Sequence, residues 1–361
     1  MSTIKSPYFV DWAITAKCNL NCRHCRGMAE EGLSTERAVK LIDEIAELKP
    51  SWVIIEGGEP LLRKDLFSLL KIMQQKQLEV HLITNGMLLT HSILNTLKQL
   101  GVKVMISIDG ATKETYESIR QGANFERTIE AARQCVQEGL LEAINFTILS
   151  KNYREIPGIM KMAKSIGVSK LTFIGLKPCQ FYPEELLKPE ECEEAIRLAC
   201  ESAQETGVEF FFDEPFFWAT VREKKLLAQM PSESTGILHP STTACIFGEY
   251  LFIEPSGEVK PCTFAPMVLG NINEKSLVDI WHATLSSPFF QKFKDPANRN
   301  GHCVSCQHYA DCMGCRSRTF VLTEDWFASD PVCPLQPNQA VNLSTATQSS
   351  NKSVHCNLIK Q

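Results

Sequence analysis

The chain has 361 residues, of which 44% are hydrophobic and 22% charged, and its formal net charge is −5 at pH 7. This length and composition suit a globular protein of about two domains. The negative charge argues against a general nucleic-acid-binding protein, because surfaces that bind phosphates are strongly basic. No apolar run approaches the roughly 20 residues that span a bilayer, and the N-terminus lacks the apolar core of a signal peptide. We therefore expect a cytoplasmic protein without nucleic-acid or membrane partners.

Strand-like and helix-like segments alternate along the first half of the chain. Short runs of Val, Ile, Leu and Phe predict buried strands, and apolar residues every three or four positions predict helices. The expected strands lie at 8–15, 52–55, 80–83, 102–108, 143–149 and 170–174. The expected helices between them begin at residue 35 and continue at 66–73, 92–100, 125–138 and 156–166. Repeated strand–helix units predict an α/β fold with a parallel sheet and its chemistry at the C-terminal ends of the strands.

The second half of the chain is less periodic. A helix at 188–205 and a strand at 208–212 precede an irregular stretch, and the density of cysteines then rises. Fifteen cysteines are more than packing alone explains. Disulfide-rich scaffolds are small secreted domains, whereas clustered thiols in a reducing cytosol more often bind metal. The last residues, 337–361, are polar and predict a flexible tail.

Three thiols stand within eight residues near the N-terminus, at Cys18, Cys22 and Cys25. Iron–sulfur clusters usually take four cysteines, so this C-x3-C-x2-C triplet leaves one iron of a four-iron cluster open to another ligand. A zinc site or three unrelated buried thiols is the alternative interpretation.

The triplet, the segment Gly57-Gly58-Glu59-Pro60 and the cysteine-rich C-terminal third together resemble radical S-adenosylmethionine (SAM) enzymes with a SPASM domain. The resemblance implies a partial (β/α)6 TIM-like barrel followed by a small SPASM domain that binds auxiliary clusters. It also implies a [4Fe-4S] cluster whose open iron binds SAM and cleaves it reductively to methionine and a 5′-deoxyadenosyl radical. We expect the barrel at 1–187, a bridging helix and linker at 188–238, the SPASM domain at 239–336 and the tail at 337–361.

By the same resemblance, the SAM contacts come from the ends of the strands. Gly57, Gly58 and Glu59 are expected at the amino group of SAM. Ser107, in a Ser-Ile-Asp-Gly segment, is expected at its ribose or carboxylate, and Arg120 at its carboxylate, since a planar guanidinium can donate two parallel hydrogen bonds. The predicted site is completed by Thr84, Asn85, Asn145 and Leu176. The alternative is that these residues form ordinary turns and that Arg120 lies on the surface.

Seven C-terminal cysteines form a second pattern, at Cys245, Cys262, Cys303, Cys306, Cys312, Cys315 and Cys333. Two C-x2-C pairs could bind a structural zinc. The resemblance instead implies two auxiliary [4Fe-4S] clusters, one held by Cys303, Cys306, Cys312 and Cys333 and the other by Cys245, Cys262 and Cys315. His239 is a candidate fourth ligand of the second cluster. The x2 spacing between Cys312 and Cys315, where many members have x3, leaves the placement of Cys315 open.

The remaining candidates are single residues. His24 is expected to stack on the adenine of SAM or to pack, and Asp11 and Trp12 either face the barrel or pack. No acid or base is assigned, and Cys179, just after the sixth strand, is the one other thiol proposed as a radical or proton relay. Thiols at 135, 192, 200 and 356 are expected to be structural.

The expected function is hydrogen abstraction from a cofactor or tetrapyrrole precursor or from a peptide, with the auxiliary clusters accepting the electron left on the substrate. The short stretch before Cys18 and the presence of Thr263, where sulfatase-maturing relatives have an aspartate, favour a cofactor precursor or a peptide delivered by a partner. A flavodoxin or ferredoxin is the expected reductant. Alternatives are a ribosomal peptide or protein maturase with a separate recognition partner, a non-catalytic Fe–S electron-transfer protein, and a zinc-stabilised binding module.

Overall fold

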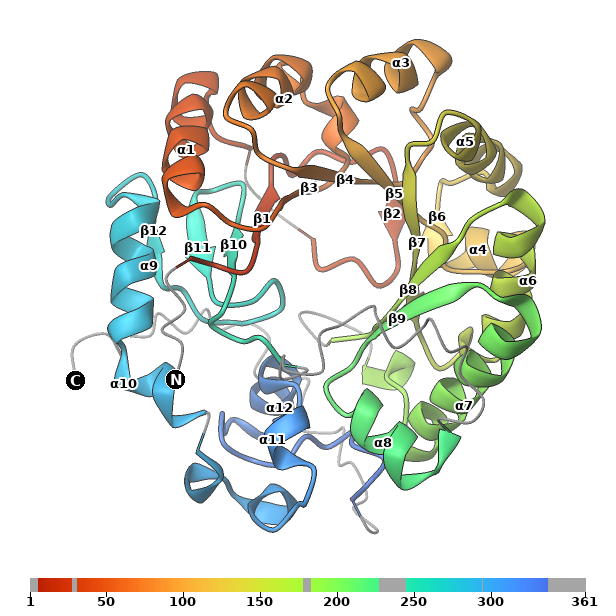
Figure 1. Cartoon of the computed structure of the whole chain (residues 1–361), viewed down its shortest axis with the longest axis vertical. Helices are drawn as coiled ribbons and strands as arrows, with labels where there is room; N and C mark the ends of the chain where they lie inside the picture. Colours follow the sequence, from red (N-terminus) through yellow and green to blue (C-terminus); the bar gives the residue numbers. More distant parts are fainter. Residues whose placement is uncertain (1–5, 28–30, 178–182, 227–244, 294, 337–361) are drawn as a thin grey trace.

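A single curved sheet organises the computed structural model, which describes residues 6–27, 31–177, 183–226, 245–293 and 295–336 (Figure 1). In spatial order its strands are β12 (Gly270–Asn271), β11 (Glu258–Lys260), β10 (Leu251–Ile253), β1 (Val10–Ala13), β3 (Val53–Glu56), β4 (Val80–Thr84), β5 (Lys103–Ser107), β7 (Leu141–Ile148), β8 (Lys170–Gly175) and β9 (Glu209–Asp213). Neighbours from β10 to β9 pair in parallel, and β10, β11 and β12 pair antiparallel. The sheet is therefore a partial barrel.

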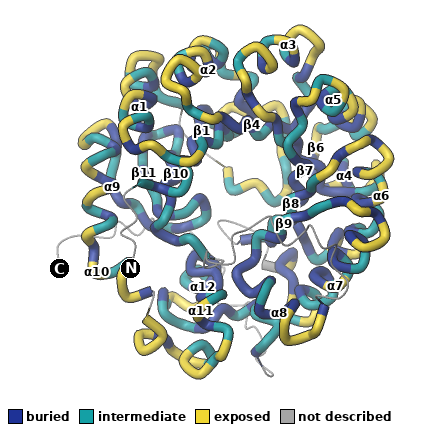
Figure 2. Tube along the Cα trace, in the orientation of Figure 1, coloured by how far each residue is buried: buried dark blue, intermediate teal, exposed yellow. Residues whose placement is uncertain are grey.

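Helices that connect successive parallel strands cover the outer face of this sheet (Figure 1). They are α1 (Thr35–Leu48), α2 (Leu66–Gln75), α3 (His91–Gln99), α4 (Lys113–Ile119), α5 (Phe125–Gln137), α6 (Ile156–Ile166) and α7 (Pro189–Thr206). Helix α1 shows the sequence logic: the Ser34 side chain accepts a hydrogen bond from the backbone N–H of Arg37, and the residues Ala38, Leu41 and Ile45 on one face are fully buried. Figure 2 shows the same division, with buried residues in the sheet and exposed residues on the outer helices.

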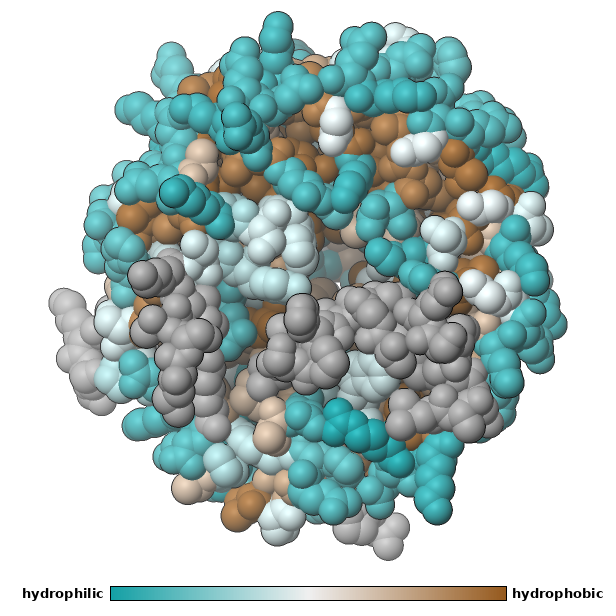
Figure 3. Space-filling view, viewed as in Figure 1, coloured by the Kyte–Doolittle hydropathy of each residue, from teal (hydrophilic) through white to brown (hydrophobic). Residues whose placement is uncertain are grey.

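The C-terminal part contains short helices and turns. The helices are α8 (Phe217–Glu223), α9 (Leu277–Ser286), α10 (Pro288–Lys292), α11 (Tyr309–Cys312) and α12 (Arg316–Thr323), and the 3-10 turns are η6 (Pro296–Asn298) and η7 (Gly301–Val304). The barrel part has three further 3-10 turns among its described residues: η1 (Pro60–Leu62), η2 (Tyr153–Glu155) and η3 (Pro183–Glu185). Six aromatic rings form the apolar centre of this part: Phe247, Phe289, Phe290, Phe293, Trp326 and Phe327. Figure 3 shows mainly hydrophilic side chains over the outer helices, and apolar ones along the inner rim.

The predicted α/β fold is confirmed, and each of the six predicted strands overlaps a strand of the sheet. The parallel run is longer than six units, because β9 joins beyond β8 and β10 pairs with β1 at the other edge. Strand β10 comes from a region 238 or more residues after β1, so local sequence carries no sign of this pairing. Among the described helices, none is long and apolar enough to cross a membrane. The predicted tail at 337–361 lies outside the described residues.

A buried ion-pair network joins the barrel to the C-terminal part. The guanidinium of Arg318, on α12, donates to both carboxylate oxygens of Glu214 at 2.8 and 2.7 Å and to Asp330 at 2.9 and 2.6 Å. All three side chains are almost fully buried. Glu214 packs on the end of β8, where a Cβ added to Gly175 would lie 1.7 Å from its Oε1. The glycine is therefore needed for this close approach.

Replacing Arg318 with alanine should destabilise the protein by about 3–5 kcal/mol, because two buried carboxylates lose their partner. The measurement is the urea midpoint of the iron-loaded protein under anaerobic conditions. Arg197→Ala is the matched control, since Arg197 forms an exposed pair with Glu201 one turn away on α7 and such pairs contribute about 0.3–0.5 kcal/mol. Equal shifts in the two variants would contradict the role assigned to Arg318.

Candidate active site

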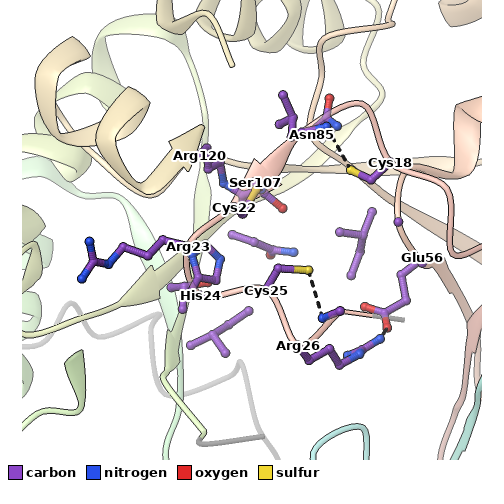
Figure 4. A pocket seen from close by; sticks show the side chains of 18 of the residues that line it. Cys18, Cys22, Arg23, His24, Cys25, Arg26, Glu56, Asn85, Ser107 and Arg120 are labelled. Carbon is purple, nitrogen blue, oxygen red and sulfur yellow. Dashed lines mark hydrogen bonds and ion pairs between the residues drawn. The ribbon is translucent and has the colours of Figure 1, made fainter. Parts of the chain in front are cut away.

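A cavity of about 650 Å³ opens at the C-terminal ends of the parallel strands (Figure 4). One side is the loop that follows β1, and the other is formed by strand ends. The lining includes many of the residues predicted to bind SAM: Gly57, Gly58, Thr84, Asn85, Ser107, Arg120, Asn145 and Leu176. Because parallel strands bring their carboxyl ends to the same edge, residues from 57 to 176 in the sequence meet here.

The three N-terminal thiols line this cavity and are not in disulfides. Figure 4 shows Cys18, Cys22 and Cys25 around the middle of the cavity, with Cys22 beside Arg120 and Cys18 beside Asn85. The backbone N–H of Leu20 donates to Cys18 Sγ and that of Gly27 to Cys25 Sγ, each at 3.4 Å. Burial raises the pKa of Cys18, and the hydrogen bond from the Leu20 N–H opposes that rise.

These thiols fit a multi-iron cluster better than a zinc ion. No three His, Cys, Asp or Glu side chains in the described ranges converge as the ligands of one metal ion would. In a four-iron cluster each thiolate binds a different iron, so the ligands surround the cluster instead of meeting at one point. Three thiols line this cavity with open space beside them, and their assignment as cluster ligands stays a prediction.

A small sheet of two strands, each two residues long, fixes the position of the cysteine loop. Strand β2 (Asn21–Cys22) pairs antiparallel with β6 (Arg120–Gln121), so that Cys22 stands opposite Arg120. In addition, the backbone N–H of Arg23 donates to the carbonyl of Ile119 at 2.8 Å. Local sequence carries no sign of this pairing, because two-residue strands have no periodicity to detect.

The Gly-Gly-Glu segment is packed against the start of the same loop. The N–H groups of Gly58 and Glu59 donate to the carbonyls of Thr15 and Lys17, both at 2.7 Å. A Cβ on Gly57 would lie 2.4 Å from the Thr15 carbonyl oxygen, and Gly57 has a φ of 144°. The two glycines thus allow close approach by the cysteine loop itself.

Glu59 is fully buried behind the lining residues. Its carboxylate accepts hydrogen bonds from Thr84 Oγ1 at 2.8 Å, the Asn85 N–H at 2.9 Å and the Leu61 N–H at 3.2 Å. Burial raises the pKa of the Glu59 carboxyl, and these hydrogen bonds oppose that rise. Glu59 therefore orders the end of β4, and its contact with SAM stays a prediction.

Asp109, in the predicted Ser-Ile-Asp-Gly segment, is a fully buried centre of hydrogen bonds. Its Oδ1 accepts from the N–H of Thr147 and its Oδ2 from Arg120 Nε, both at 2.6 Å. His24 Nε2 lies 3.4 Å from the same Oδ2. Burial lowers the pKa of His24 to about 4, so a neutral imidazole faces Asp109. The stacking of His24 on adenine stays a prediction.

Several charged residues of the cavity wall were not singled out from the sequence. Arg26 makes a short ion pair with Glu56, and its guanidinium lies 4.5 Å from the centre of the Phe252 ring. Lys177 Nζ lies 3.0 Å from a carboxylate oxygen of Asp213. Arg23 points away from the three thiols in Figure 4 and carries a 3.0 Å ion pair with Glu185. Arg23 and Arg26 belong to the cysteine loop, and the fold brings Lys177 to the same cavity.

Several of the C-terminal thiols lie near one another. Burial raises the pKa of Cys333 to about 12, and the nearby thiols of Cys303 and Cys306 add to the rise. Burial likewise raises the pKa of Cys312, with Cys333 and Cys303 adding to it. Cys245 has Cys262 as its thiol neighbour, and Cys315 has Cys245. The division of these thiols between two clusters stays a prediction; Cys179 and His239 lie outside the described residues.

Comparison with known proteins decides the family. Residues 12–163 match the model of the radical SAM superfamily, and residues 245–315 match that of an iron–sulfur cluster-binding domain, SPASM. The chain is 31% identical to the AdoMet-dependent heme synthase of Methanosarcina barkeri, over 92% of this chain and 98% of that protein. The chain belongs to the radical SAM superfamily.

Two further relatives extend this picture. The PqqA peptide cyclase of Granulibacter bethesdensis is 29% identical over 93% of this chain and 90% of that protein. The solved structure of anSMEcpe with bound AdoMet and a peptide has a TM-score of 0.69 at 19% identity, covering 90% of this chain and 93% of that one, and supports the fold. The protein is thus a radical SAM enzyme with a C-terminal SPASM domain. It uses iron–sulfur chemistry to cleave SAM reductively and to abstract hydrogen from its substrate.

A second buried network lies where the radical SAM barrel meets the SPASM domain. Thr263, next to the SPASM residue Cys262, donates its hydroxyl to Asp11 Oδ2 at 2.7 Å. The N–H of Thr263 donates to the hydroxyl of Tyr250 at 2.9 Å. Burial raises the pKa of Asp11 well above its usual range, and the nearby Glu56 carboxylate adds to the rise, while Arg26 opposes it. Asp11 faces the barrel interior at this seam, and Trp12 packs in the core.

Asp11→Asn should make stability less dependent on pH. Because the pKa of Asp11 is higher in the folded than in the unfolded protein, the folded state binds more protons and stability falls as pH rises above the usual carboxyl value near 4. The melting temperature of the variant relative to wild type should therefore increase between about pH 5 and about pH 8.

Asp65→Asn provides a control of opposite sign. Hydrogen bonds from Arg63 and Thr35 outweigh partial burial and lower the pKa of Asp65, so its stabilisation is lost as pH falls. A pH-independent difference between Asp11→Asn and wild type would contradict the buried environment of Asp11.

Proposed function

We propose that this radical SAM enzyme oxidises a carboxylated tetrapyrrole precursor. The charges on the cavity wall support this proposal. Four cations, Arg23, Arg26, Arg120 and Lys177, line the described part of the cavity, against the single carboxylate of Glu56. The carboxylate partners Asp109 and Asp213 do not line it. A wall of this kind favours an anionic substrate. The relationship to AdoMet-dependent heme synthase over nearly the whole chain agrees with it.

The residues at the cavity have three separate roles: binding the cluster, binding SAM and binding the substrate. Cys18, Cys22 and Cys25 hold the SAM cluster, which supplies the electron and, with SAM, the hydrogen-abstracting radical. The strand-end residues Ser107 and Asn145 serve the SAM site, and Arg23 and Lys177 orient the carboxylates of the substrate; all four line the cavity. Exclusion of water by the barrel keeps the radical from side reactions.

The proposal includes two auxiliary clusters that accept the electron left on the substrate, which makes the net reaction an oxidation. The neighbour relations among the thiols support one set of Cys303, Cys306, Cys312 and Cys333, and another of Cys245, Cys262 and Cys315. His239 stays a candidate for the fourth ligand of the second set, and Cys179 for a relay. A flavodoxin or ferredoxin would supply the first electron.

A peptide substrate is the second candidate. The PqqA peptide cyclase relative and the peptide bound in the anSMEcpe structure favour it. Against it, Thr263 stands next to Cys262, where a sulfatase-maturing enzyme has an aspartate. The cations of the cavity wall also match a compact substrate with several carboxylates better than they match an acidic peptide.

The test of the proposed function is anaerobic incubation of the iron-loaded enzyme with SAM, dithionite and iron coproporphyrin, followed by mass spectrometry. The expected result is 5′-deoxyadenosine together with a porphyrin of lower mass. Arg23→Gln should raise KM for the porphyrin roughly tenfold with little change in kcat, because it removes one charge-assisted hydrogen bond of about 1.5 kcal/mol.

The control for this experiment is Arg154→Gln, which removes the same charge from an exposed side chain on η2, outside the cavity. Equal KM values for wild type and Arg23→Gln would rule out the role of Arg23 in binding the substrate carboxylates, and the absence of a porphyrin product would rule out the tetrapyrrole and leave the peptide candidate.

Cysteine variants separate the two kinds of cluster. Cys22→Ala should abolish 5′-deoxyadenosine formation, since the SAM cluster loses one of only three protein ligands. Cys303→Ala combined with Cys306→Ala should leave cleavage of SAM measurable while product falls at least about tenfold. If the double variant retains full product formation, the auxiliary clusters do not accept the substrate electron.

A further inference from the structure

The arrangement of Arg120 differs from that of a residue that only binds SAM. Its Nη1 lies 3.8 Å from Cys22 Sγ, and its Nε donates to Asp109 at 2.6 Å. The backbones of Cys22 and Arg120 are direct partners across the β2–β6 pair. The backbone pairing and the side-chain hydrogen bonds therefore hold the positive charge of Arg120 next to the sulfur of Cys22, and the negative charge of Asp109 on the other side of Arg120.

Both charges are removed from bulk water. Asp109 is fully buried, and Arg120 is 9% exposed. Three bonds fix the Asp109 side chain and its own backbone: Thr147 N–H to Oδ1, Arg120 Nε to Oδ2, and Asn152 Nδ2 to the Asp109 carbonyl. Charges in such surroundings act on each other much more strongly than charges in water. Neither can turn away from the loop without breaking these bonds.

We propose that Arg120 and Asp109 together set the reduction potential of the cluster held by Cys18, Cys22 and Cys25, acting with opposite signs. Reduction adds one negative charge to the cluster. The Arg120 guanidinium, which is in contact with Cys22, stabilises the reduced form and raises the potential. The carboxylate of Asp109 lies one residue farther back and partly offsets this effect. This inference rests on the proposed assignment of the cluster to the three thiols.

The consequence is a cluster whose reduction potential is high enough for the cell's reductant to reduce it and low enough for it to pass an electron to SAM. Without Arg120 the cluster would be harder to reduce, and without Asp109 it would be easier to reduce but a poorer donor. Arg120 also becomes a positioning residue for the cysteine loop, in addition to its predicted contact with the SAM carboxylate.

The test is an anaerobic redox titration of the full-length, iron-loaded enzyme followed by electron paramagnetic resonance. The signal component that changes on adding SAM identifies the open-iron cluster among the others. We expect Arg120→Gln to shift its midpoint to a more negative potential and Asp109→Asn to a more positive one. Arg120→Lys, which keeps the charge, should stay close to wild type.

Arg197→Gln is the matched control, because it removes the same charge from an exposed pair on α7 and should leave the midpoint unchanged. Shifts of the same sign in Arg120→Gln and Asp109→Asn, or no shift in either, would overturn the inference. If Arg120→Gln fails to incorporate iron, Asp109→Asn decides alone: a positive shift supports the inference, and a negative or absent shift overturns it. A wild-type enzyme with no SAM-dependent signal would instead refute the cluster assignment.

Discussion

The antiparallel pairing of β2 with β6 is the contact on which the radical SAM site depends. A loop carrying three thiols has little apolar content to fold on, so something else must hold it over the strand ends. The pairing of Cys22 with Arg120, and the packing of Gly57 and Gly58 on Thr15 and Lys17, supply that support from two sides. Contacts within the protein therefore fix the loop to the barrel without any contribution from a cluster.

Buried charge is the second organising principle. Glu59, Asp109 and Glu214 all lie at strand ends, and each is satisfied by several hydrogen bonds within the protein. Burying a carboxylate is expensive unless it is paired in this way. These groups order the rim of the barrel, and Arg120, the partner of Asp109, lines the cavity. The cations of the proposed substrate site, Arg23, Arg120 and Lys177, pair with carboxylates that do not line the cavity.

The SPASM domain is joined to the barrel by structure as well as by sequence order. Strand β10 extends the barrel sheet beside β1, Thr263 bonds to Asp11, and Arg318 bonds to Glu214. Thiols expected to hold auxiliary clusters thus stand on a rigid extension of the substrate cavity. Electron transfer between substrate and cluster depends steeply on separation, so a fixed seam of this kind suits the proposed oxidation.

The sequence by itself determined the α/β alternation, the cysteine triplet and the glycines after the second predicted strand, because these are local patterns of spacing and periodicity. It also marked Ser107, Arg120 and Asn145, all of which line the cavity. Only the tertiary structure decided that Glu59 lies behind the wall, that Arg120 bonds to Asp109 and faces Cys22, and that Arg23, Arg26 and Lys177 form a cationic wall. The physical reason is that partners far apart in the chain, such as Cys22 and Arg120 or Asp11 and Thr263, leave no periodic trace and meet only when the sheet closes.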